Sequence, residues 1–406
     1  VHGTFTSDGS RFEGNGHDAG RYSQSAPMHL LLDLPRIHSS AGALDLFLTR
    51  ATIQNTSFTG NHGDHGGAVL AQSSTVSLQV VTADRNSALS GGAIVSLRGG
   101  VPLDDDTLGG ALELSNVKMR GNTASEDGGA IVTNGDVHGV DVLFSGNRAG
   151  RNGGAIAFSP PEKNFAAAQA GANPAQVPLM PAGSLSLSRA FLLDQVSAGP
   201  TVDGQSAAAL RLGNVLAVRN GTRDSKAAVL RGSGMSLAGS TLADNTAAGL
   251  DVIPGGSGAT LANTILTGNK GGNCSSGSAG VTALGGNVQN PASDCGDAVS
   301  RSDPALDSRY APALTSSARN GGSPNACAED PLVGGVDVYG EERAPSNCSI
   351  GAVETDTRRD LEKKITSMSG GRVGEEQIML GGMALFVLCV LLGLLAGFRH
   401  RRRRRQ

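Results

Sequence analysis

Residues 144–156 read Phe-Ser-Gly-Asn-Arg-Ala-Gly-Arg-Asn-Gly-Gly-Ala-Ile, and this order of residue types returns along the chain. An Asn, usually preceded by Gly, is followed a few residues later by Gly-Gly-Ala and then Ile or Val. The clear copies are marked by Asn61, Asn86, Asn122 and Asn147, with steps of 25, 36 and 25 residues. Weaker copies are marked by Asn15, Asn220, Asn245 and Asn269. The long step contains a polar insert at residues 99–109, which accounts for the excess. A repeat of this length predicts a solenoid.

Short runs of strand-forming residues lie between the repeated motifs, such as residues 75–81 and 111–114, and Gly, Asn and Asp separate them. Their length and punctuation indicate β-strands rather than helices. We therefore predict an all-β chain wound into a parallel β-helix, whose coils stack at about 4.8 Å. Ordinary hairpin turns also use Asn-Gly and Gly-Gly, but hairpins do not require a constant period.

The repeated residues have physical roles in such a coil. An apolar residue at the same phase of each turn builds an internal stack, and Asn side chains at one corner form a ladder of amide hydrogen bonds. The ladder is predicted to contain Asn61, Asn86, Asn122 and Asn147. The Gly-Gly pair either supplies a positive φ or lets neighbouring coils approach closely.

The composition agrees with a thin core, since the 406 residues include 59 Gly, no Trp and 3% aromatic residues. The formal net charge is −3, and six Arg lie in the last eight residues. Removing those six charges leaves −9 on residues 1–398. An acidic body lacks the basic face that nucleic-acid binding requires, so no nucleic-acid partner is expected.

The patterns divide the chain into five regions. They are β-helix coils at 1–273 with insert loops at about 99–109 and 160–183, a cysteine-containing β-helix end at 274–354, a charged linker at 355–377, an apolar span at 378–398 and an Arg-rich tail at 399–406. The chain begins with Val1 rather than Met, so we expect an export signal upstream of it.

Four cysteines lie near the end of the predicted coils: Cys274, Cys295, Cys327 and Cys348. An even count in an exported protein predicts disulfides. Three pairings are possible, and the separation of 21 residues within each sequential pair favours local bonds that staple long loops. The alternative is four free buried thiols in a cytosolic protein. Cys389 lies in the apolar span and stands apart from this set.

The span at residues 378–398 contains no charged residue and is long enough to cross a bilayer as one helix. Clustered Arg beside such a helix stays in the cytoplasm. The residues that set this topology are Arg399, Arg401, Arg402, Arg403, Arg404 and Arg405. The rod is then expected on the outer side of that membrane. A buried core helix is the alternative, but a thin rod could not cover it.

Gly381-Gly382 lies near the outer end of this span. Gly weakens a helix by about 1 kcal/mol relative to Ala, so the pair suits an intramembrane protease that must unwind its substrate. A helix-packing face explains the glycines equally well.

The Gly pair, the span and the Arg cluster together resemble the GlyGly-CTERM sorting tail of Gram-negative bacteria. That resemblance implies an inner-membrane precursor with an exported ectodomain. Rhombosortase, a rhomboid-family intramembrane serine protease, would cut it, and export machinery, often type II secretion, would pass it to the surface or outside. The cleavage region is expected at Gly381 and Gly382, with Ser369, Gly370 and Gly371 as the alternative.

The coils, through Gly-Asn followed by Gly-Gly-Ala-Ile, resemble the right-handed β-helix of polymorphic outer-membrane-protein repeats. Residues 302–306, 318–323 and 348–354 are similar to the last coil of choice-of-anchor β-helix proteins. A coil of that kind with a GlyGly tail looks most like the rhombotarget A family. Ser349 stands where that last-coil pattern usually has Asp.

Catalytic residues are harder to find. Inverting glycoside hydrolysis needs two carboxylates about 6.5–9.5 Å apart, which on a rod means acids one period apart. Asp64 has Leu89 at that position, and residues 126–127, both acids, have Arg151 and Asn152. His62 and His65 flank Asp64 and could ligate a metal, but a polar surface loop is the simpler interpretation. The acidic run at 104–106 could likewise hold Ca²⁺ or form a solvated loop. No enzyme activity, metal or cofactor is predicted.

The sequence therefore favours a surface-displayed or secreted rod that binds carbohydrate or a host surface. A polysaccharide lyase or glycosidase on the same scaffold is the alternative. A third possibility is a permanently anchored protein whose tail is never cut.

Overall fold

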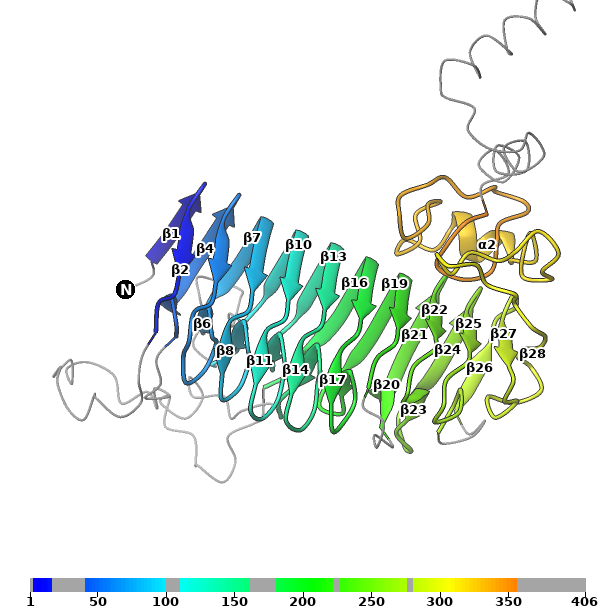
Figure 1. The fold of residues 1–406 in the computed structure, drawn as a ribbon, viewed down its shortest axis with the longest axis horizontal. Coiled ribbons are helices and arrows are strands. Elements are labelled where there is room, and N and C mark those ends of the chain that lie inside the picture. The colour runs from blue at the N-terminus through cyan, green and yellow to red at the C-terminus, as the bar shows by residue number, and fades with distance from the viewer. Residues whose placement is uncertain are drawn as a thin grey trace, which may run out of the picture. The chain divides into compact units, whose positions relative to one another are not determined.

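A computed structural model describes residues 3–16, 41–99, 110–160, 180–221, 227–275 and 280–355. These residues form parallel strands in three sheets, and one short helix, α2 (Pro324–Ala328), lies among them. Successive coils lie side by side in chain order (Figure 1). The prediction of an all-β chain with stacked parallel strands is confirmed, and its right-handed sense stays a prediction.

Sheet A is the largest, and every strand pair in it is parallel. Its strands are β1 (Gly3–Asp8), β2 (Arg11–Glu13), β4 (Thr49–Gln54), β5 (Ser57–Thr59), β7 (Thr75–Asp84), β10 (Leu112–Arg120), β13 (Val137–Ser145), β16 (Ser184–Leu193), β19 (Ala209–Val218), β21 (Gly234–Ala238), β22 (Thr241–Ala243), β24 (Gly258–Ala262), β25 (Ile265–Thr267), β26 (Val281–Ala283), β27 (Val288–Asn290) and β28 (Ser300–Arg301).

Two smaller sheets contain the remaining strands. Sheet B contains β8 (Ser87–Ala88), β11 (Thr123–Ala124), β14 (Arg148–Ala149) and β17 (Val196–Ser197). Sheet C contains β3 (Leu44–Phe47), β6 (Val69–Gln72), β9 (Ile94–Leu97), β12 (Ile131–Thr133), β15 (Ile156–Phe158), β18 (Val202–Gly204), β20 (Ala228–Gly232) and β23 (Ala248–Val252).

The register shows how the coils tolerate insertions. Val76 pairs with Leu112, a step of 36, and Val137 pairs with Leu185, a step of 48. Ordinary steps are 25, as between Leu112 and Val137. The strands on either side of each insertion keep the same register, because the apolar face must stay inside.

The core consists of columns of equivalent side chains. One column on sheet C is formed by Val69, Ile94, Ile131, Ile156, Val202, Leu230 and Leu250, each at most 1% exposed. A second column on sheet A includes Ile53, Leu78, Leu114, Leu187 and Leu212. Burying each such side chain stabilises the rod by about 1.5–3 kcal/mol, so repetition supplies a core with few aromatic residues, among them Phe58 and Phe144.

The two glycines of the Gly-Gly pair have different structural roles. The first, as in Gly91 and Gly128, has a φ of 65° to 67°, a region that L side chains rarely adopt. The second, as in Gly92, lies where a Cβ would collide with the carbonyl oxygen of Gly129 in the next coil. Both explanations drawn from the sequence therefore apply, one to each residue.

Residues 302–355, here called the flank segment, pack against the side of sheet A after the last strand, β28 (Figure 1). Ala311, Val338 and Val353 of this segment cluster with Leu216 and Val218 of β19. Ser188 in β16 donates from its Oγ to the carbonyl oxygen of Leu332 at 2.6 Å, so the contact reaches several coils back along the rod.

Within the described ranges, no helix has the length and hydropathy needed to cross a membrane. The predicted span at residues 378–398 lies outside those ranges. The linker after Thr355 and the Arg-rich tail also lie outside them, as do residues 100–109 and 161–179 of the insert loops.

Candidate functional site

The asparagine ladder is the most regular polar feature of the rod. Asn86 donates from its backbone N–H and from Nδ2 to Oδ1 of Asn122, both at 3.0 Å. Its Nδ2 also donates to the carbonyl oxygen of Phe58 at 3.1 Å. Asn61 and Asn147 lie in the same column, and all four predicted residues are fully buried. Each carboxamide thus satisfies groups in its own and neighbouring coils, which a buried polar side chain requires.

The ladder extends beyond those four residues. Its further members are Asn15, Gln195, Asn220, Asn245 and Asn269. Asn269 then donates from Nδ2 to Oδ1 of Asn273, four residues further along the chain. Gln195 was missed because it is not an Asn and follows an insert. Its step of 25 to Asn220, with an apolar residue three places before it, is the signal that could have found it.

The turns between sheets B and C, here called the turn face, contain the acidic residues that were considered above for catalysis. Arg151 contacts Glu126 at 3.1 Å and Asp127 at 2.8 Å, and the backbone N–H of Asn152 donates to Asp127 Oδ1 at 2.9 Å. The two acids therefore lie opposite Arg151 and Asn152 of the next coil, as the 25-residue period predicted. Exposed ion pairs of this kind contribute at most about 1 kcal/mol.

The histidines lie on the same face. His62 Nδ1 lies 2.9 Å from Ser87 Oγ, the equivalent residue of the next coil. His65 forms an isolated parallel bridge with Ser90. No group of three metal-ligating side chains occurs in the part of the chain that the structure describes. The acidic run at 104–106 lies outside that part.

Two disulfides are present in the C-terminal part of the described chain. Cys274–Cys295 has a Cα–Cα distance of 5.1 Å and joins the last coils of the rod. Cys327–Cys348 has a Cα–Cα distance of 6.5 Å and lies within the flank segment. Both distances fall in the range that disulfides adopt. Asn263 anchors the second bond to the rod, because its Nδ2 donates to the carbonyl oxygen of Ser323 at 3.0 Å.

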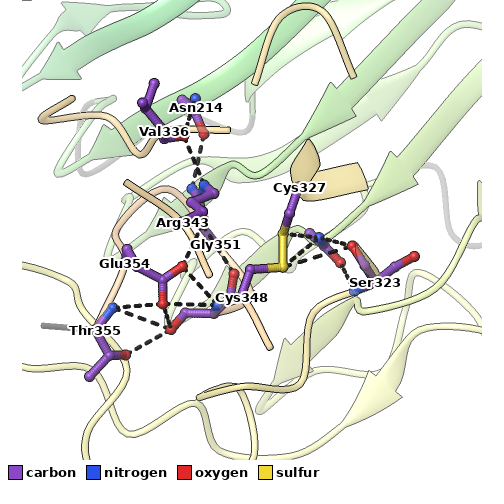
Figure 2. The surroundings of a disulfide bond; sticks show 11 residues. Asn214, Ser323, Cys327, Val336, Arg343, Cys348, Gly351, Glu354 and Thr355 are labelled. Carbon is purple, nitrogen blue, oxygen red and sulfur yellow. Dashed lines mark hydrogen bonds and ion pairs between the residues drawn. A yellow bond between two sulfur atoms is a disulfide. The ribbon is translucent and has the colours of Figure 1, made fainter. Parts of the chain in front are cut away.

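A buried guanidinium lies at the centre of the flank segment (Figure 2). Arg343, 4% exposed, donates to Asn214 Oδ1 at 2.9 Å and to the carbonyl oxygens of Gly351 at 2.8 Å and Val336 at 2.9 Å. Burial lowers the pKa of Arg343, and Glu354 opposes that effect. An Arg side chain stays charged even so. It therefore ties the flank segment to Asn214 of the rod.

Glu354 extends this hydrogen-bond network from Arg343 to Ser349. Its carboxylate lies 3.5 Å from Arg343 Nη1 and accepts a 2.6 Å hydrogen bond from Ser349 Oγ. The backbone N–H of Glu354 donates to Asp337 Oδ2 at 2.9 Å, and Thr355 N–H donates to Ser349 Oγ at 3.3 Å. The network fixes the chain up to the last described residue, directly before the charged linker. We name residues 343–355 the tail junction.

The sorting and topology residues of the tail cannot be placed in this way. Gly381 and Gly382, the alternative Ser369 to Gly371, and the Arg cluster from Arg399 to Arg405 all lie outside the described residues.

Comparison with known proteins adds one match. Residues 141–159 match the Chlamydia polymorphic membrane protein repeat. The matched stretch contains Asn147 of the ladder, the pair Gly153-Gly154, and strands β14 and β15. No curated protein and no solved structure matches the chain. The chain is therefore similar to that repeat over one coil.

Proposed function

We propose that this protein is an exported β-helical rod, displayed at the cell surface, that binds carbohydrate or a host surface. The observation that carries this proposal is the stack of coils, one of which matches a repeat of polymorphic membrane proteins. A rod of repeated coils offers a long, stiff surface with many turns, which suits adhesion. The two disulfides support export, because such bonds persist in oxidising compartments.

The tail supplies the sorting step in this proposal. Residues 378–398 hold the precursor in the inner membrane of a Gram-negative cell, and the Arg cluster keeps its end in the cytoplasm. A rhomboid-family protease of the rhombosortase type cuts at Gly381-Gly382, and export machinery passes the rod outward.

The tail junction supports a division between rod and tail. Its hydrogen bonds and ion pair hold the chain as far as Thr355, and the charged linker begins there. Cleavage beyond residue 355 would therefore leave these contacts intact.

Mass spectrometry of the mature C-terminus tests the sorting step. In a strain with the rhomboid-type protease we expect the protein to end near residues 381–382, and in a strain without it we expect full-length protein in the membrane fraction. A Gly381→Leu/Gly382→Leu variant should behave like the protease deletion, while Gly370→Leu/Gly371→Leu should be cut normally. Full-length protein in both strains would contradict the proposal and favour permanent anchoring.

A glycan array tests adhesion. Mature protein should bind a subset of glycans without releasing reducing ends. Release of reducing ends that is lost on an Asp-to-Asn change would instead establish the polysaccharide-degrading alternative.

A further inference from the structure

The chain enters the charged linker from the side of the rod. The last strand of the rod, β28, has two residues, and both are exposed. Among the described residues it pairs with β27 alone. The flank segment then returns along sheet A as far as β16, where Leu332 contacts Ser188. Thr355, the last described residue, therefore follows a second set of contacts with the rod and not β28 itself.

The end of the flank segment is bonded directly to buried groups of sheet A. The N–H of Gly351 donates to the backbone carbonyl oxygen of Asn263 at 2.9 Å. The N–H of Ala352 donates to Thr241 Oγ1 at 2.8 Å. These two bonds lie only a few residues before the linker, so they are the first bonds to the rod that a pull on the linker would meet among the described residues.

The attachment spans three coils. Arg343 bonds to Asn214 Oδ1 at 2.9 Å (Figure 2). Asn214, Thr241 and Asn263 are all 0% exposed. They lie in successive coils, because β19 pairs with β21 and β22, which pair in turn with β24 and β25. The tail junction is thus bonded to three neighbouring coils at once.

Apolar packing protects the same attachment. Ile350 lies in a buried cluster with Ile265. Ala352 and Val353 lie in another with Leu216. The three flank residues are at most 4% exposed, so water is kept from the bonds beside them. Hydrogen bonds are stronger in such a low-dielectric environment than in water.

Asn263 contacts the flank segment on both sides of a disulfide. Its Oδ1 accepts from the N–H of Ser323 at 2.6 Å, and its Nδ2 donates to the carbonyl oxygen of Ser323 at 3.0 Å. Its backbone carbonyl accepts from Gly351. Cys327 and Cys348 lie between these two contacts in the chain. A pull from the linker therefore crosses the disulfide and does not stretch the loop that this bond closes.

We propose that the flank segment is a tension clamp, which passes a pull on the tail to three coils of the rod. A pull applied at β28 would break its backbone bonds one after another. A pull at the tail junction instead acts on the bonds to Asn214, Thr241 and Asn263 together. Forced unfolding is governed by the unfolding rate, and the clamp lowers that rate. This inference rests on the proposed function, in which residues 378–398 anchor the rod before cleavage.

Single-molecule pulling of the full chain in detergent tests the clamp by comparing two attachment points. One handle replaces the exposed Lys118 on β10 with a clickable residue. The other is a ligation tag, inserted either after Gly370, so that tension arrives through the linker, or after Arg301, so that it arrives at β28. We expect the first opening event at a force at least about twofold higher for the linker attachment. Equal forces would overturn the proposal.

Thr241→Val separates the clamp from general stability. It keeps the shape of the side chain but leaves the N–H of Ala352 without its acceptor. The opening force should fall for the linker attachment and stay unchanged for the tag after Arg301. Thr260→Val on β24 is the matched control, since the Thr260 side chain makes no hydrogen bond among the described residues, and it should change neither force. An equal fall in both attachments would contradict the clamp.

The length of released chain identifies the segment that opens. In a Cys327→Ser/Cys348→Ser variant, the first event under linker attachment should release about 70 Å more chain, because the closed loop is then stretched. An unchanged length would contradict the proposal, since another segment would be opening first. The test needs no protease. An uncut tail in mass spectrometry would therefore contradict the sorting step alone, and equal opening forces would contradict the clamp alone.

Discussion

The coils and the flank segment are stabilised in different ways. In the coils, each contact is one of a series: Leu78 stacks on Leu114, and Asn86 bonds to Asn122, as in the coils on either side. In the flank segment, Arg343 and the Cys327–Cys348 bond each occur once. Solenoid stability is close to a sum of repeat and nearest-neighbour terms, so a lost contact in one coil removes one of many equivalent terms. A lost contact in the flank segment removes an interaction that has no equivalent there.

Arg343→Met should show the largest effect. It leaves the buried carboxylate of Glu354 without its cation, and breaking a buried pair costs about 3–5 kcal/mol. We expect hydrogen exchange and proteolysis to become faster in residues 302–355 while the coils stay protected. The matched control is Arg151→Met, which removes exposed pairs with Glu126 and Asp127 of the neighbouring coil and should cost at most about 1 kcal/mol.

The double variant Arg343→Met/Glu354→Gln should recover part of the loss, because no unpaired charge remains. Wild-type protection of the flank segment in Arg343→Met would show that the ion pair does not hold it.

Removing Cys327–Cys348 should have the next largest effect. The bond closes a loop with a sequence separation of 21, for which restriction of the unfolded chain predicts about 3 kcal/mol. A Cys327→Ser/Cys348→Ser variant should lose exchange protection in the flank segment only. Cys274→Ser/Cys295→Ser is the comparison, and it should loosen the last coils instead. Equal patterns in the two variants would argue that the flank segment and the end of the rod unfold as one unit.

Asn122→Ala tests the repeated part. It leaves two donors of Asn86 without an acceptor inside the rod, and each unsatisfied buried group costs about 1–3 kcal/mol. We expect a total loss of about 2–3 kcal/mol, measured by denaturant unfolding. Asn15→Ala is the control, since this side chain is exposed among the described residues and its loss should cost less than about 1 kcal/mol. Similar losses for both would mean that burial does not set the strength of the ladder.

The contrast between repeated contacts in the coils and single contacts in the flank segment explains which features the sequence could predict. The period placed Asn61, Asn86, Asn122 and Asn147 in one column and set Glu126 opposite Arg151 one coil later, because each coil repeats the geometry of the last. Periodicity also predicted the strands and the inward apolar face.

The flank segment follows no period. The sequence identified its cysteines, but not that Arg343 would reach Asn214, which lies 129 residues earlier. Nor did it show that Ser349 would bond to Glu354, so that an Asp at this position would bring a second carboxylate against the first. Contacts that occur once leave no repeated signal in a single sequence.

A pH titration gives the smallest expected effect and separates two coil residues. Burial raises the pKa of Asp203 on β18, with the N–H of Gln205 and the charge of Arg231 opposing it. A raised folded-state pKa means that the contribution is fully present below the ordinary pKa and is lost as pH rises through the folded-state value. Asp203→Asn should therefore unfold at a slightly higher denaturant concentration than wild type at pH 7. This corresponds to a free energy of unfolding that is higher by less than about 1 kcal/mol. The difference should vanish at pH values below the ordinary carboxyl pKa.

Asp136 should respond in the opposite sense. Burial tends to raise the pKa of Asp136, but hydrogen bonds from Ser184 and the nearby Arg98 hold it below its ordinary value. Its contribution is present above the ordinary carboxyl pKa and is lost as pH falls through the folded-state value. Asp136→Asn should thus destabilise the rod at pH 7, with the difference shrinking in acid. Denaturant unfolding from pH 3 to 8 checks both variants. If both shifted in the same direction at pH 7, burial and hydrogen bonding would not be what distinguishes these two carboxylates.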